Sequence, residues 1–196
     1  FYDASAGDLA YVRAADTQGA TWGAPVRVDV DGDVGRYASL AVVDDRPALA
    51  YLDQDAKALR YVRAADAWGN SWGAPVVVDA DGSVGVEASL AVIDGRPAIA
   101  YFYSGNGRLK YVRALDAAGA AWGTPIVVDA AGVVGNYASL AVVLDRPAIS
   151  YYDRTNGDLK YVRLCSALVP TPLPSSTGTV TRTPTTTRTP SVTPTP

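Results

Sequence analysis

Short apolar runs separated by turn residues fill most of the chain. From residue 87 the runs read "EASLAVID", "RPAIAYFY", "RLKYVRALD" and "AWGTPIVVD", the last of which ends at residue 129. Asp94-Gly95, the segment "SGNG" at 104–107 and Gly119 separate them. Short β-rich runs with such punctuation, at intervals of about 8–12 residues, are typical of all-β proteins. The pattern therefore predicts four short strands between residues 87 and 129.

This four-strand unit recurs at a fixed interval. Residues 11–60, 61–110 and 111–160 superpose without insertion or deletion, and "YVR", "ASLAV" and "RPA" recur at equivalent places. Residues 1–10 and 161–163 continue the same pattern. A period of this length indicates one supersecondary unit copied in tandem, in which neighbouring copies bury each other's apolar faces.

The pattern within a copy indicates how its strands are buried. Strands one and two are apolar at nearly every position, which predicts burial on both faces. Strand three alternates, with Leu109, Tyr111 and Arg113 on one side and Lys110 and Val112 on the other. Strand four is expected to contain Pro25, Pro75 and Pro125, and proline is confined to edge strands because it donates no ladder hydrogen bond. We therefore expect strand four to be outermost.

Four-stranded antiparallel units in tandem predict a β-propeller, with a β-solenoid as the alternative. With strand four outermost, residues 38–79 and 88–129 form whole blades, and the remainder gives about three and a half blades in residues 1–165. A closed propeller has about four to eight blades. The chain is thus expected to be a fragment that continues into further blades, or a unit that closes its ring by self-association.

The composition changes abruptly after residue 165. Residues 166–196 are mostly Thr, Pro and Ser and contain no aromatic or acidic residue. Such a segment cannot bury enough apolar surface to fold, so we expect a disordered linker or stalk. Thr/Ser/Pro-rich stalks are often glycosylated outside the cell, which favours an extracellular or cell-surface location.

Charge and cysteine content narrow the possible partners. The formal net charge is −3 and no basic stripe is present, so nucleic acid is not an expected partner. No apolar run reaches the roughly 18–20 residues of a membrane helix, so no membrane insertion is expected. The single cysteine, Cys165, excludes an internal disulfide and is interpreted as a partly buried residue at the domain end.

The segments "AADTQGATWGAPV" at 14–26 and "AADAWGNSWGAPV" at 64–76 resemble the Asp-box, S-x-D-x-G-x-T-W, of sialidase-like propellers. Ala replaces the leading Ser, and one extra residue separates Asp from Gly. The matching residues are Asp16, Gly19, Thr21 and Trp22, then Asp66, Gly69, Ser71 and Trp72, and Asp116, Gly119 and Trp122 in the third copy. The resemblance implies structural hairpins between strands three and four. The whole body is also similar to the "YYDxxNGDLKYVRA" repeats of uncharacterised bacterial surface proteins, a resemblance that implies no known activity.

The residues for catalysis or for metal binding are few. The chain has no His and one Cys, which excludes Ser-His and Cys-His arrangements and a zinc site. Calcium is the remaining candidate, through Asp29, Asp31 and Asp33, but this loop lacks the Gly and Glu of an EF-hand. Later copies lose these carboxylates and keep both glycines, which favours a turn. We therefore expect no cofactor and no enzyme activity within this chain.

The loops at one end of each blade are the expected ligand site. They span 29–37, 79–87 and 129–137, together with 53–58, 103–108 and 153–158. Their candidate ligand residues are Arg36, Tyr37, Glu87, Asn136, Tyr137, Asp53, Tyr103, Asn106, Asp153 and Asn156. One interpretation is a noncatalytic surface module that binds carbohydrate or a surface protein through repeated weak sites. The other is a structural repeat, or the noncatalytic part of a secreted glycan-processing enzyme.

Overall fold

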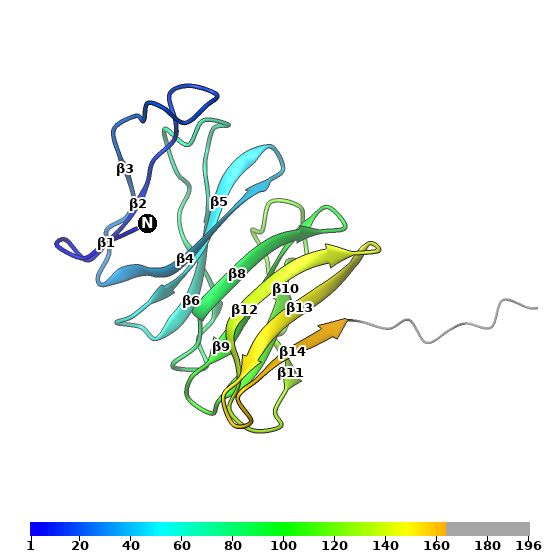
Figure 1. The fold of residues 1–196 in the computed structure, drawn as a ribbon. Coiled ribbons are helices and arrows are strands. Elements are labelled where there is room, and N and C mark those ends of the chain that lie inside the picture. The colour runs from blue at the N-terminus through cyan, green and yellow to red at the C-terminus, as the bar shows by residue number, and fades with distance from the viewer. Residues whose placement is uncertain (164–196) are drawn as a thin grey trace, which may run out of the picture. The chain divides into compact units, whose positions relative to one another are not determined.

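The computed structural model describes residues 1–163, and the predicted linker and Cys165 lie outside the described residues. This part of the chain is all-β, with fourteen strands in four separate antiparallel sheets (Figure 1). We call the sheets blades 1 to 4 in chain order. The predicted propeller architecture of four-stranded antiparallel blades is confirmed, and with it the estimate of about three and a half blades.

Blades 2 and 3 contain four strands each, in sequential order across the sheet, whereas blades 1 and 4 contain three. The strands of blade 1 are β1 (Tyr2–Asp3), β2 (Asp8–Tyr11) and β3 (Val26–Asp29). Those of blade 2 are β4 (Val34–Val43), β5 (Arg46–Asp53), β6 (Ala58–Arg63) and β7 (Val76–Asp79). Those of blade 3 are β8 (Val86–Ile93), β9 (Arg96–Tyr103), β10 (Arg108–Arg113) and β11 (Ile126–Asp129). Those of blade 4 are β12 (Val134–Val143), β13 (Arg146–Asp153) and β14 (Asp158–Arg163).

Two predicted strand boundaries were wrong. The fourth strands have four residues and begin directly after Pro25, Pro75 and Pro125, so these prolines precede the ladder instead of lying in it. The first strands begin at residue 34, 86 or 134, before the expected start near 38 or 88, because a bulge extends them. At the bulge Tyr37, Glu87 and Tyr137 all have φ near +53°.

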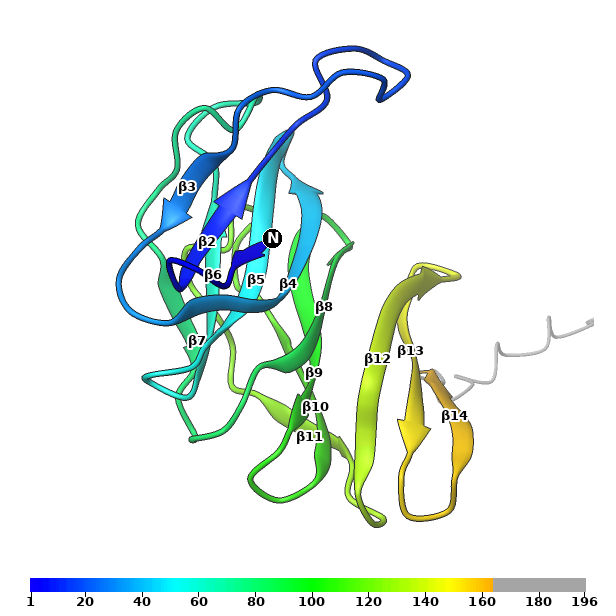
Figure 2. The same cartoon turned by 60° about the vertical axis from the view of Figure 1, so that its left-hand side comes forward.

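The blades stack face to face in chain order, with blade 1 at one end and blade 4 at the other (Figures 1 and 2). The first strands of neighbouring blades are also linked. The Ser39 hydroxyl accepts a hydrogen bond from the Leu90 backbone N–H at 2.9 Å, and Ser89 accepts one from Leu140 at the same distance. Apolar side chains from facing sheets fill each junction, as the repeat predicted.

Close backbone approach at each junction requires glycine. A Cβ on Gly35 would lie 2.8 Å from the Leu9 Cα, and one on Gly135 would lie 2.8 Å from the Leu109 Cα. The φ angles of these glycines are +103° and +104°. Glycine therefore recurs here because the neighbouring blade leaves no room for a side chain and because the backbone is left-handed.

Candidate functional site

The two sets of loops predicted to form the ligand site lie side by side. Within blade 2 the Gln54 N–H donates to the Asp33 carbonyl at 2.9 Å, and the Asp55 carboxylate accepts from the Asp33 N–H at 2.9 Å. The equivalent pairs in blades 3 and 4 are Ser104 with Ser83 and Arg154 with Val133. This loop end of the propeller is therefore a surface held together by hydrogen bonds between its own loops.

Arg36 serves the junction between blades 1 and 2. Its guanidinium donates two hydrogen bonds to the Asp33 carboxylate, at 3.2 and 3.0 Å, and one to the Tyr2 hydroxyl at 3.0 Å. It also lies 4.6 Å from the centre of the Tyr2 ring. The Asp33 carboxylate raises the pKa of Arg36 in return. Of the predicted pair at this position, Arg36 is thus committed to internal contacts and Tyr37 is exposed.

Glu87 occupies the same bulge one blade later and also bridges blades. Its carboxylate accepts the Tyr137 backbone N–H at 2.5 Å and the Asn136 side-chain amide at 3.4 Å. The Tyr137 ring is exposed and lies 6.4 Å from the Tyr152 ring, centre to centre. The structure brings Glu87, Asn136 and Tyr137 together, but the Glu87 carboxylate is already bound to the Tyr137 backbone.

The remaining predicted loop residues divide into buried and exposed groups. Asp53 and Asp153 are each 1% exposed and accept backbone N–H groups of their own turns. The Tyr103 hydroxyl donates to the Asp81 carbonyl at 3.1 Å. Asn106 and Asn156 are exposed. The expectation that Asp53 and Asp153 face a ligand is corrected, because burial and turn hydrogen bonds occupy both carboxylates.

A polar triad recurs at all three blade junctions, buried or partly buried, and was not predicted. In the first, the Asp29 carboxylate accepts from the Tyr51 hydroxyl at 2.6 Å and from the Arg60 guanidinium at 3.2 Å. Burial and the Asp29 carboxylate raise the pKa of Tyr51. The equivalent triads are Asp79 with Tyr101 and Lys110, and Asp129 with Tyr151 and Lys160. In each triad a carboxylate at the end of the fourth strand of one blade binds two side chains of the next blade.

The three aspartates considered as calcium ligands point to different partners. Asp29 points into the junction, Asp33 pairs with Arg36, and Asp31 is exposed. Within residues 1–163 no three His, Cys, Asp or Glu side chains lie close enough together to hold a metal ion. The Asp29 carboxylate instead caps its own turn by accepting the Asp31 N–H at 3.2 Å, as the turn interpretation predicts.

The hairpins of Asp16, Asp66 and Asp116 are each held by their aspartate. Asp66 accepts backbone N–H groups of Trp68 at 2.8 Å and Ser71 at 3.0 Å, and the Ser71 hydroxyl at 2.9 Å. The Trp72 indole N–H donates to the Gly69 carbonyl at 3.1 Å. The tryptophan then packs edge-on against a tyrosine of the preceding blade, with Tyr11 and Trp72 5.2 Å apart and Tyr61 and Trp122 5.1 Å apart. The hairpins of Asp66 and Asp116 therefore hold neighbouring blades together.

A pocket opens beside each of these tyrosine–tryptophan contacts, at the end of the propeller opposite the predicted site. The first has a volume of about 220 Å³ and is lined by Tyr11, Arg13, Gly23, Trp68, Gly69 and Asn70, among others. The second has a volume of about 270 Å³ and is lined at equivalent positions by Tyr61, Arg63, Gly73, Ala118, Gly119 and Ala120. The two pockets are repeats of one another, because the two junctions are.

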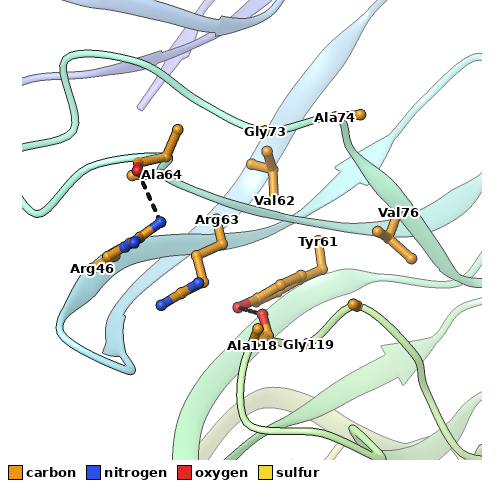
Figure 3. A pocket seen from close by; sticks show the side chains of 12 residues that line it. Arg46, Tyr61, Val62, Arg63, Ala64, Gly73, Ala74, Val76, Ala118 and Gly119 are labelled. Carbon is orange, nitrogen blue, oxygen red and sulfur yellow. Dashed lines mark hydrogen bonds between the residues drawn. The ribbon is translucent and has the colours of Figure 1, made fainter.

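The polar groups of the second pocket are visible in Figure 3. The Tyr61 hydroxyl donates to the Ala118 carbonyl at 3.0 Å, across the junction. Arg46, on the 1–2 hairpin as expected, donates to the Ala65 carbonyl at 2.8 Å. Arg63 donates to the Val43 carbonyl at 2.9 Å and pairs with Asp44. Aromatic, glycine backbone and guanidinium surfaces thus meet in one concavity.

The first pocket carries a larger aromatic surface. The Arg13 guanidinium lies 4.1 Å from the centre of the Trp68 ring, and the Trp68 side chain is 59% exposed. In the second pocket Ala118 stands where Trp68 stands in the first. The repeated Arg of "YVR" and the variable residue before the hairpin glycine were the sequence signals for these pockets. They could not be recognised in the sequence, because the lining comes from two blades.

Comparison with known proteins bears on the fold. No protein-family model and no curated protein matches the chain. The structure is similar to that of a mutant of NanB sialidase from Streptococcus pneumoniae, with a TM-score of 0.51 and 12% identity. The match covers 76% of this chain and 27% of the sialidase, so the chain spans about a quarter of that protein. An exo-1,5-alpha-L-arabinanase from a bovine ruminal metagenomic library also aligns, with a TM-score of 0.45, 13% identity and coverage of 77% and 61%.

These findings define the class of structure. Separate antiparallel sheets stacked in sequence, together with the likeness to the sialidase, identify a sialidase-like β-propeller fold. Among residues 1–163 no helix could span a membrane.

Proposed function

We propose that the chain is a noncatalytic extracellular module that binds glycans through the pockets repeated at its blade junctions. The observation that carries this proposal is the recurrence of one pocket at two consecutive junctions, built from equivalent residues. Several similar weak sites on one rigid scaffold raise overall affinity for a polymeric ligand by avidity. The proposal keeps the repeated binding sites expected from the sequence and moves them to the opposite end of the blades.

The chemistry of the first pocket suits a sugar. The exposed Trp68 ring offers an apolar face, and Asn70 and the hairpin backbone offer hydrogen-bonding groups beside it. Pockets that combine an apolar floor with a few polar groups are typical small-molecule sites. The Arg13 guanidinium adds a positive charge at the rim, which favours a glycan carrying a carboxylate.

A noncatalytic binding role is further supported because several carboxylates are already engaged in hydrogen bonds within the protein. Glu87, the one glutamate, holds the Tyr137 backbone, and Asp29, Asp79 and Asp129 are engaged in the junction triads. Glycoside hydrolysis commonly needs two free carboxyl groups flanking the scissile bond. In this proposal the hairpins that resemble the Asp-box are structural elements. They support the pockets at the blade junctions.

The alternative is a structural repeat or the noncatalytic part of a secreted glycan-processing enzyme. The likeness to a sialidase favours it, because that protein is a glycan-processing enzyme and is much longer than this chain. In either case the Thr/Pro-rich segment fits a place outside the cell.

A titration with sialyllactose and with lactose tests the proposal. We expect saturable chemical-shift changes in the backbone amide signals of Gly69 and Asn70, which line the first pocket, with tighter binding of the charged sugar. Trp68→Ala should abolish them. Trp22→Ala is the matched control, because the Trp22 side chain is equally exposed, at 60%, and does not line either pocket. If neither sugar binds at millimolar concentration, or if both variants bind alike, the structural alternative is the better account.

A further inference from the structure

The three junctions of the stack share a leucine–glycine contact, so a free blade face can be compared with covered ones. At each junction a leucine of the third strand packs under a glycine of the next blade. Leu9, Leu59 and Leu109 are each 0% exposed in this position. Two residues further on, Tyr11 and Tyr61 are 8% and 2% exposed beneath the tryptophan of the next blade.

Blade 4 presents the same face uncovered. Leu159 is 82% exposed and Tyr161 is 60% exposed, although both stand in strand β14 at the positions that are buried in blades 1 and 2. Figure 2 shows the described chain ending on this side of the stack with β14. Exposed apolar surface of this kind, with the side chains of a regular junction, marks an interaction surface.

Blade 1 presents the complementary half of the same contact. Trp22 corresponds to Trp72 and Trp122, which pack edge-on against tyrosines of the preceding blade, but it is 60% exposed. Its hairpin is already formed, because Asp16 accepts three backbone N–H groups and the Trp22 indole donates to the Gly19 carbonyl at 3.0 Å. The tryptophan is therefore held in the orientation that a tyrosine would meet.

The polar triads indicate which blade fits in front of blade 1. Register pairing places Phe1 and Ala10 where Tyr151 and Lys160 stand in blade 4. Blade 1 therefore lacks the hydroxyl and the cation that receive a carboxylate from a preceding fourth strand. A preceding blade of the ordinary kind would bury that carboxylate without a partner, which strongly disfavours the contact.

The sequence that follows the third strand of blade 4 supplies no carboxylate of this kind. Residues 164–196, where a fourth strand would continue the repeat, contain no acidic residue. Tyr161 on the face of blade 4 can pack against Trp22 of blade 1. Blade 4 also lacks the fourth-strand aspartate, for which blade 1 has no hydrogen-bonding partner. A second copy of this chain thus satisfies both conditions.

We infer that two copies of this chain associate head to tail, with Tyr161 of one copy packed edge-on against Trp22 of the other. The interface joins two different surfaces, so it closes only when the rotation between copies completes a ring. Two copies contribute eight sheets, within the range of about four to eight blades found in closed propellers.

Light scattering on the full chain under reducing conditions, from about 1 to 200 µM, tests this inference. We expect a concentration-dependent dimer, and Trp22→Ala and Tyr161→Ala should each weaken it by about tenfold or more, as loss of an interface aromatic commonly does. Trp68→Ala is the matched control, with 59% exposure on an equivalent hairpin, and should leave the dimer unchanged. A mixture of the Trp22→Ala and Tyr161→Ala chains keeps one intact contact and should associate more tightly than either variant alone.

A photo-crosslinking residue at position 161 gives an independent readout. It should capture residues 19–22 of a second copy, and circular dichroism should show that each variant remains folded. A monomer at 200 µM would overturn the inference. So would a dimer that neither aromatic substitution weakens, or a crosslink that maps elsewhere.

Discussion

The Tyr51 hydroxyl donates a 2.6 Å hydrogen bond to the Asp29 carboxylate across the junction between blades 1 and 2. Tyr51 is fully buried and Asp29 is 5% exposed, so water cannot replace this bond. The pair shows how consecutive blades are aligned by polar contacts within an otherwise apolar junction. The same relationship at Tyr101 and Tyr151 makes the alignment a property of the repeat.

Removing one triad hydroxyl should destabilise the propeller. We expect Tyr51→Phe to lower the free energy of unfolding by about 1–3 kcal/mol, because the buried Asp29 carboxylate loses its closest donor. Urea denaturation measures the change. Tyr37→Phe is the control, since the Tyr37 side chain is 51% exposed and lies outside the junction triads, and an equal loss in both variants would contradict the argument.

Stability should fall in acid, between about pH 4 and pH 2. Desolvation opposes charging of Asp129, but hydrogen bonds from Lys160 and from the Ala131 backbone outweigh it and lower the pKa of Asp129 to about 2. Desolvation also opposes charging of Asp66, and the Trp68 backbone and Ser71 hydroxyl lower the pKa of that group to about 2. A depressed carboxyl pKa stabilises the fold above the unfolded value of about 4, and this contribution disappears as the pH falls towards the folded value.

Urea denaturation at pH 5, 4, 3 and 2 measures this dependence. Asp66→Asn should be less stable than the parent at pH 5 and should approach it at pH 2. An unchanged difference between the two proteins across this range would show that the Asp66 charge does not stabilise the hairpin.

The junction glycines should tolerate alanine poorly. We expect Gly135→Ala to cost more than about 3 kcal/mol, because its Cβ would lie 2.8 Å from the Leu109 Cα and its φ is +104°. Gly157→Ala is the matched control, since its φ is +78° and no atom lies within 4 Å of an added Cβ. Strain alone should cost that variant about 1–2 kcal/mol. Similar losses of unfolding free energy would contradict the crowding argument.

One hairpin turn offers a stabilising substitution. Leu144 and Asp145 have φ angles of +51° and +57°, a two-residue turn that favours Asn or Asp at its first position. The equivalent residues are Asp44 and Asp94, whereas the Leu144 side chain is 78% exposed. We expect Leu144→Asn to raise the free energy of unfolding by about 0.5–1 kcal/mol. Calorimetry against Leu144→Ala separates turn preference from loss of an exposed apolar side chain, and a decrease in both variants would refute the prediction.

The sequence predicted the fold well because aligning the repeat copies shows where each strand and turn lies. Identical spacing of apolar runs and turns gave fourteen strands, their order within a blade and the outermost position of strand four. It placed the strand boundaries less well, because the bulges at Tyr37, Glu87 and Tyr137 require left-handed residues that no local pattern announced.

The candidate site was the harder problem. Asp53 and Asp153 are of a residue type that often binds ligands, but their carboxylates accept backbone N–H groups of their own turns. Arg13, Trp68 and Arg63 instead line pockets at the opposite end of the blades. Each pocket is made by a third strand and by a hairpin of the next blade, more than fifty residues away. No local pattern reports such a pair.

By itself the sequence determined the repeat, the all-β class and the places of the turns, because these follow from periodicity and from the backbone preferences of turn residues. Only the tertiary structure decided which carboxylates are buried, which aromatics remain exposed and where pockets open. Those properties depend on the neighbouring blade, and identical residues such as Leu109 and Leu159 differ from 0% to 82% in exposure through that neighbour alone.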